Sequence, residues 1–348
     1  MHVASLPLVR AFSVSRAPLL ALAIAHAGAC STTEAAKPEP SVDVRVRADL
    51  TRPRQAADAV VVEPLRYEEG EHGLAFIDGR TGKALTYDDV VARMRASEIV
   101  LVGEQHDQVP HHALQARVVT SLGDEPSLAI GLEMVPWSLQ APLERYTKGE
   151  IDADGLAGAL SWQETWGYDF ELYRPIFDAG RKKGARFVAL NAPKEVVRAV
   201  AKGGVDSLPE GERGEVPDLD LTDDTHKQGI FEIFRNHHPP TGHGGMEKAF
   251  ERFYLVQVLW DESMADRAAR ALDDGAKKVV VLAGNGHVAG YRGIPNRIAR
   301  RKPTAKIFTI VPITLDEGED AEAIVKGAVI DGEADVIAVV RPREVLAI

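Results

Sequence analysis

The chain is poor in the residues that define several common classes of site. Cys30 is the only cysteine among 348 residues, so the chain cannot form an intrachain disulfide. The paired Cys-x-x-Cys spacing of structural zinc sites is absent for the same reason. The sequence also contains neither His-Glu-x-x-His nor Gly-x-Ser-x-Gly, the motifs of zinc proteases and serine hydrolases. Any chemistry must therefore come from residues that the fold brings together.

Basic residues and long apolar runs are also scarce. Lys and Arg number 41 against 52 Asp and Glu, which gives a formal net charge of -11. This balance argues against nucleic acid or an anionic membrane surface as the main partner. Beyond the first 30 residues, no apolar run is long enough to span a bilayer. With 45% hydrophobic residues, the chain can still bury a full core.

The N-terminus has the pattern of an export signal. Arg10 and Arg16 precede an apolar stretch, residues 17–25, that is too short to cross a membrane as a mature helix. Small residues then lead to Cys30, as in a bacterial lipobox. We therefore predict a signal peptide over residues 1–29 and acylation of Cys30, with an ordinary secretory signal as the alternative. Either reading predicts an exported protein of the bacterial cell envelope, in the periplasm or lipid-anchored at the outer membrane.

Composition divides the remaining chain into three parts. Residues 30–73 are rich in Ala, Pro and charged residues, and we expect a flexible tether that follows the lipid anchor. Residues 74–313 form the main domain. Residues 314–348 are expected to be a C-terminal extension, acidic at first and ending in a strand over residues 336–340.

Within the main domain, apolar runs of strand length alternate with helical patterns, which predicts an α/β fold. We expect a mostly parallel central sheet with helices on both faces. Two longer helical patterns, residues 223–236 and 246–272, predict a helical lobe around a loop rich in His, Pro and Gly. The expected strands of the main domain include 98–103, 127–132, 186–190, 277–283 and 305–311.

Three of these strands end in polar residues of the kind that carry chemistry. Gly103–His106 follows the first strand, Glu133 the second, and Gly284–His287 a later one. In α/β proteins such residues gather just past the carboxyl ends of the strands. The sequence therefore predicts one site at one edge of the sheet.

This strand-end set suits a divalent metal ion. His106, His287, Glu133 and Glu104 could supply ligands and leave open positions for water. The metal would lower the pKa of a bound water, and whichever of Glu104 and Glu133 is not a ligand could act as general base. The alternative is that these side chains only pin loops to the sheet by hydrogen bonds. Four further residues could orient the set from outside: His111, His112, Asn285 and Asp261.

Together these motifs resemble the ChaN-like haem-binding uptake lipoproteins of the Tiki/TraB/erythromycin-esterase-like superfamily. The resemblance covers about residues 74–313 and implies an α/β fold that binds haem at the bacterial envelope. In more distant relatives it implies a metal-dependent protease, with two Gly-x-x-His motifs and a Glu as ligands. The matching segments are Gly103–His106, His111–His112 with Gln115, Leu132–Met134, Trp162 with Trp166–Gly167, Leu190–Pro193, Gln257 with Trp260–Ala265, Gly284–His287 and Gly293–Arg297.

Haem requires apolar ring faces, an axial ligand such as His or Tyr, and cations for its propionates. Residues 226–254 offer all three, and with no Cys-x-x-Cys-His motif any haem would be bound non-covalently. The aromatic stripe Phe250, Phe253 and Tyr254 recurs on one helix face, for which core packing is the alternative. The haem-binding candidates are His237, His238, His243, Tyr254, Arg235 and Arg252.

We therefore predict an envelope lipoprotein that binds haem and takes part in haem or iron uptake. The alternatives are a metal-dependent hydrolase of peptide or ester bonds and a scaffold that retains only the fold. A homodimer could share the haem, and the haem site and the strand-end site could coincide. An aromatic cluster of Trp162, Trp166 and Tyr168 could either pack between helices or line a cleft.

Overall fold

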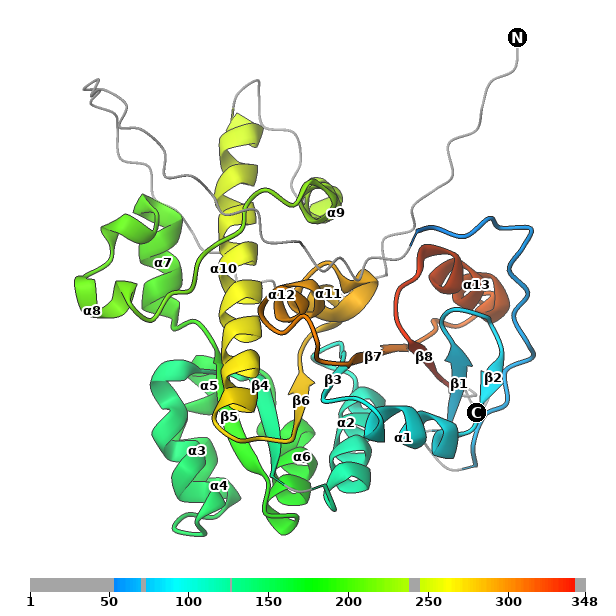
Figure 1. Cartoon of the computed structure of the whole chain (residues 1–348), viewed down its shortest axis with the longest axis horizontal. Coiled ribbons are helices and arrows are strands. Elements are labelled where there is room, and N and C mark those ends of the chain that lie inside the picture. Colours follow the sequence, from blue (N-terminus) through cyan, green and yellow to red (C-terminus); the bar gives the residue numbers. More distant parts are fainter. Residues whose placement is uncertain (1–52, 70–72, 126, 238–244, 342–348) are drawn as a thin grey trace, which may run out of the picture. The chain divides into compact units, whose positions relative to one another are not determined.

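The computed structural model describes residues 53–69, 73–125, 127–237 and 245–341 (Figure 1). Several predictions lie outside these ranges: the signal peptide, Cys30, and most of the tether. The same holds for His238 and His243, and for the side chain of His237, whose backbone ends a helix. In the described part of the chain, no helix is both long and apolar enough to cross a membrane.

An eight-stranded sheet forms the centre of the fold, in the order β2-β1-β8-β7-β3-β6-β4-β5. The strands from β8 to β5 are parallel, whereas β1 runs antiparallel to both β8 and β2. The predicted mostly parallel sheet is thus confirmed. The strands are β1 (Leu74–Asp78), β2 (Ala84–Leu85), β3 (Ile99–Val102), β4 (Leu128–Pro136), β5 (Arg186–Asn191), β6 (Lys278–Leu282), β7 (Ile307–Ile313) and β8 (Val336–Val340).

Helices cover both faces of this sheet, as predicted (Figure 1). Val100 and Val102 of β3 point to one face and pack with α1, α2 and α6, whereas Ile99 and Leu101 point to the other and pack with α10 and α12. A central strand buried on both faces reads as an unbroken apolar run. The main helices are α1 (Tyr87–Arg95), α2 (Val109–Leu122), α3 (Gln140–Thr147), α4 (Ala153–Ala159), α5 (Trp162–Thr165), α6 (Phe170–Lys182), α7 (Lys194–Gly203), α8 (Glu210–Arg213), α9 (Asp224–His237), α10 (Gly245–Asp273), α11 (Asn285–Val288), α12 (Ile294–Arg301) and α13 (Ala321–Asp331).

The predicted helical lobe is formed by α9 and α10, and α10 extends past the sheet toward α9 (Figure 1). Aromatic rings join α9 to α10: Phe231 lies 4.9 Å from Phe250, and Phe234 lies 5.3 Å from Phe253, between ring centroids. Phe250 and Tyr254 are buried in this cluster. Phe250 and Tyr254 of the aromatic stripe are therefore core packing of the lobe, whereas Phe253 is only half-buried.

The ends of the described chain contribute more to the domain than composition suggested. β8 pairs with both β7 and β1, and the acidic stretch before it contains α13, a helix that was not predicted. Asp320 caps that helix, and Val325 and Val329 bury its apolar face. Val60 and Val62, within the expected tether, pack in the same cluster as α13.

Candidate functional site

The carboxyl ends of β3, β6 and β4 are neighbours, because these strands are adjacent and parallel. Gly103–His106 follows β3 and Gly284–His287 follows β6. Glu133 lies inside β4, which runs four residues beyond the predicted end to Pro136, at an irregularity in its pairing with β5. A Cβ placed on Gly284 would lie 3.0 Å from His106 Cε1 and 3.6 Å from Glu133 Oε2. The fold therefore brings the three motifs into one cluster, which we call the strand-end cluster.

Asn285 ties the loops of this cluster together. Its backbone N–H donates to the carbonyl of Glu104 at 2.8 Å, and its side-chain amide donates to the carbonyl of Pro312 at 2.9 Å. A Cβ on Gly103 would lie 2.0 Å from Asn285 Oδ1, so no side chain fits there. The glycine is required by this close approach.

Glu104 is the buried acceptor of the cluster, only 1% exposed. His106 Nδ1 lies 2.7 Å from one carboxylate oxygen, the Tyr173 hydroxyl donates to the same oxygen at 3.2 Å, and His112 Nδ1 lies 2.9 Å from the other. Burial alone would raise the pKa of Glu104, but the contacts with His106 and His112 outweigh it and lower the pKa to about 2. The carboxylate is thus ionised at neutral pH.

His106 is the more accessible histidine of the cluster, with 30% of its side chain exposed. Its ring lies 4.8 Å from Trp166 and 5.1 Å from Tyr168, between centroids. Burial lowers the pKa of His106, but the hydrogen bond and the charge of Glu104 more than compensate, so the pKa is raised overall. Nδ1 faces Glu104, which leaves Nε2 on the side of Gly284.

His287 has a carboxylate at each ring nitrogen. Nδ1 lies 2.6 Å from Asp261 Oδ1, and Nε2 lies 3.5 Å from Glu133 Oε1. Burial lowers the pKa of His287, but the charges of Glu133 and Asp261 outweigh it and raise the pKa to about 9. The other oxygen of Glu133 accepts the backbone N–H of Gly284 at 2.6 Å. His287 is therefore cationic at neutral pH.

His111 and His112 differ in role although they are neighbours in sequence. The backbone N–H of Gln105 donates to His111 Nδ1 at 2.9 Å, so the ring proton is on Nε2, which lies 2.9 Å from the Thr314 hydroxyl. Burial lowers the pKa of His111 to about 3, and its ring stays neutral. His112 Nε2 lies 3.2 Å from the carbonyl of His106. His112 thus contacts Glu104, whereas His111 braces the loop.

The divalent metal ion predicted for His106, His287, Glu133 and Glu104 is not supported. Among the residues that the structure describes, no three His, Cys, Asp or Glu side chains form a group that could hold a metal ion. The physical reason is that the proposed ligands pair with one another and with the backbone: Glu104 contacts His106, and Glu133 accepts the N–H of Gly284. The prediction treated these carboxylates as free ligands, but they are hydrogen-bond acceptors.

The described haem candidates lie on α9 and α10. Tyr254 is 1% exposed, and its hydroxyl lies 3.4 Å from His226 Nδ1 and 3.3 Å from the carbonyl of Asp223. Burial raises its pKa, so the phenol is neutral and satisfied inside the lobe. These contacts would have to break before its oxygen could bind iron. Arg235 and Arg252 are exposed, and Arg235 pairs with Glu232.

Two contributors were missing from the sequence analysis. Tyr173, on α6, reaches Glu104 across 69 residues of sequence, and Arg297, on α12, lies 3.8 Å from Asp261 and 3.3 Å from Glu262. Arg297 lies within a matching segment of the family, but nothing local marks either side chain as a partner of the cluster. Only the packing of distant helices reveals them.

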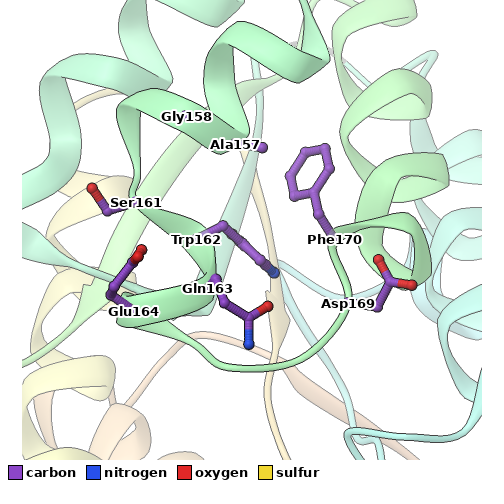
Figure 2. Close-up of a pocket in the computed structure, with 8 residues that line it drawn as sticks. All are labelled: Ala157, Gly158, Ser161, Trp162, Gln163, Glu164, Asp169 and Phe170. Atoms are coloured by element: carbon purple, nitrogen blue, oxygen red, sulfur yellow. The ribbon is translucent and has the colours of Figure 1, made fainter.

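A hollow lies at the surface formed by α4, α5 and the start of α6, and none of its lining residues belongs to the strand-end cluster (Figure 2). It is lined by the aromatic side chains of Trp162 and Phe170 and by polar residues such as Gln163 and Asp169. Trp162 is 4% exposed and lies 5.1 Å from Phe170 and 5.2 Å from Tyr173, between ring centroids. The aromatic cluster therefore divides: Trp162 packs between helices, whereas Trp166 and Tyr168 lie against His106.

Comparison with known proteins identifies the family. The family model described as haem-binding uptake, Tiki superfamily, ChaN matches residues 90–298. ChaN of Campylobacter jejuni, solved with cofacial haem, has a TM-score of 0.62 at 20% identity, over 79% of this chain and 100% of that one. A mutant of the erythromycin esterase EreC has a TM-score of 0.44 at 13% identity, over 75% of this chain and 95% of the other.

A plant protein is also similar. RETICULATA-RELATED 5 of Arabidopsis thaliana, a chloroplastic protein, is 27% identical over 234 residues. The match covers 60% of this chain but only 30% of the plant protein, so the chain spans less than a third of that relative. The family match, in contrast, covers more than half of this chain, both Gly-x-x-His motifs and the helical lobe. The chain therefore belongs to the ChaN family of haem-binding uptake proteins in the Tiki superfamily.

Proposed function

We propose that this protein binds haem non-covalently and takes part in haem or iron uptake at the bacterial envelope. The observation that carries the proposal is the family match over residues 90–298, which spans the strand-end cluster and the lobe. Haem binding by the structurally similar ChaN of C. jejuni is a property of that protein, and we extend it to this chain. The sole cysteine lies outside the match, in keeping with a non-covalent ligand.

We place the haem on the lobe formed by α9 and α10. Half-buried Phe231 and Phe253 offer apolar ring faces there, close to the end of α9 at His237. Exposed Arg235 and Arg252 are cations on the same two helices, suited to the propionates. The axial ligand would come from His237, His238 or His243, because Tyr254 is engaged inside the lobe.

The envelope location rests on sequence. Residues 1–29 would direct export, Cys30 would carry the lipid, and the part of the tether before Val60 would hold the domain away from the membrane. A homodimer sharing haem across its interface belongs to the same proposal. The metal-dependent hydrolase is the weaker alternative, since the described residues form no metal-holding group.

Haemin titration, followed by absorbance, tests the ligand assignment. The wild-type chain should show a shifted Soret band that saturates, and a variant with His237, His238 and His243 all changed to Ala should lose the shift. Lys248→Ala, an exposed residue on the same lobe, is the matched control and should bind like the wild type. Full binding by the triple variant would refute the lobe histidines as ligands, and no binding by the wild type would refute the function.

A further inference from the structure

A chain of buried polar side chains connects the lobe with the strand-end cluster. His226 on α9 is 2% exposed, and its Nε2 lies 3.2 Å from Asp261 Oδ2 on α10. The other oxygen of Asp261 lies 2.6 Å from His287 Nδ1. Side chains from α9, α10 and α11 thus meet at one carboxylate, which is itself 1% exposed.

The surroundings of His226 determine where its ring proton lies. Arg297 Nη2 lies 3.1 Å from His226 Nδ1, and a guanidinium has only donors. Nδ1 must therefore act as acceptor, so that the neutral ring carries its proton on Nε2, facing Asp261. The Tyr254 hydroxyl, 3.4 Å from the same Nδ1, also directs its proton to the carbonyl of Asp223.

Asp261 is held as an anion by the groups that face it from every side. Although burial would raise its pKa, the charge of His287, the contacts with His226 and His287, and the charge of Arg297 together lower it well below its ordinary value. Each oxygen has its own histidine, and Arg297 adds a cation 3.8 Å away. If the His226 contact were lost, Oδ2 could turn toward Arg297 and carry Oδ1 away from His287.

We infer that His226 is a positioning residue for the strand-end cluster: it fixes the carboxylate of Asp261 and, through it, the ring of His287. The orientation of His287 matters because its Nε2 faces Glu133, the acid that also receives Gly284. This role does not depend on haem, so the inference can be tested separately from the proposed function. It also ties α9, the helix that ends at His237, to the sheet edge.

Two conservative variants separate positioning from simple packing. His226→Gln places an amide donor near the position of Nε2, within reach of Asp261, whereas His226→Asn reaches only the position of Nδ1 and can serve Arg297 alone. The readout is the Nδ1–H proton of His287 in the full chain, followed by nuclear magnetic resonance. We expect His226→Gln to preserve its shift and slow exchange. We expect His226→Asn to move the signal and accelerate exchange with water about tenfold, because the 3.2 Å contact between Nε2 and Asp261 is lost.

Identical His287 signals in both variants would overturn the inference, as would equal losses in both with an unchanged melting temperature. If His226→Asn fails to fold, the wild-type chain still tests the inference. The nitrogen shifts of His226 must report a lone pair on Nδ1 and a proton on Nε2, and the opposite tautomer would contradict the proposal. Tyr254→Phe, which removes the hydroxyl contacts with His226 and Asp223 but not the contact between His226 and Asp261, should leave the His287 signal in place.

Discussion

At the scale of single residues, Glu104 shows how a charged group can be buried in this fold. One oxygen of its carboxylate accepts hydrogen bonds from His106 and Tyr173, and His112 lies 2.9 Å from the other, so the cost of removing the charge from water is offset. The sequence could predict that Glu104 belongs to the site, because it follows a strand. It could not predict that Glu104 accepts a hydrogen bond from Tyr173, since Tyr173 lies on a helix distant in sequence.

Replacing this acid should therefore destabilise the fold. In Glu104→Gln, an amide faces His106 and His112 without the charge that binds them, and we expect a loss of about 3 kcal/mol in the free energy of unfolding. Urea unfolding at pH 7 measures it. Glu144→Gln, at an exposed position on α3, is the control and should change stability by less than about 0.5 kcal/mol. Equal small effects would show that the buried pairings contribute little.

Acid should act on the same carboxylate. The pKa of Glu104 is lowered from 4.5 to about 2, so its contribution is complete above pH 4.5 and is lost as the pH falls toward 2. We expect the urea midpoint of the wild type to fall over this range, and Glu104→Gln to fall less steeply. Parallel pH profiles for the two proteins would contradict the assignment.

The contribution of His287 to stability should depend on pH in the opposite direction. Its pKa is raised from 6.5 to about 9, so its stabilising contribution is present below pH 6.5 and is lost as the pH rises through 9. The wild type should lose about 2 to 3 kcal/mol of stability between these values from this group, and His287→Gln should lose less. A wild-type stability that is flat from pH 6.5 to 9.5 would count against a cationic His287.

At the scale of elements, local pattern was enough to predict those with a clear apolar signal. β3, β6 and β8 were predicted within a residue or so, because each is an apolar run with clear ends. α13 was missed, although Val325 and Val329 recur at helical spacing between the cap Asp320 and Gly332, because its flanks are acidic. The length of β4 beyond Leu132 depends on pairing with β5, which no local pattern shows.

The loops after β3 and β6 offer a test of their close contact. In Gly103→Ala, the new Cβ would lie 2.0 Å from Asn285 Oδ1, so the two loops must separate, and we expect a loss of about 2 to 3 kcal/mol. Gly286→Ala is the matched control in the neighbouring loop, since a Cβ there meets nothing within 4 Å. In thermal unfolding, the melting temperature of the control should be close to that of the wild type. Equal stability of the two variants would show that the loops can separate at little cost, and would contradict the prediction.

At the scale of the whole molecule, one edge of the sheet and one lobe contain the candidate residues that the sequence analysis singled out, and the family match spans both. At the sheet edge, buried carboxylates pair with histidines. In the lobe, α9 and α10 pack through aromatic side chains and carry exposed arginines. Pattern and resemblance predicted both regions. They could not predict that Tyr254 would be engaged inside the lobe, because that depends on its packing against α9.

The central claim is that this chain binds haem. Its most direct test is an equilibrium titration of the chain from residue 31 onward with haemin, read at the Soret band, with the bound haem counted against protein and the mass measured by light scattering. We predict saturation near one haem per chain, or per dimer if two copies share it. A linear, unsaturable rise like that of a control protein of similar charge would contradict the claim and leave only the fold in common with haem-binding relatives.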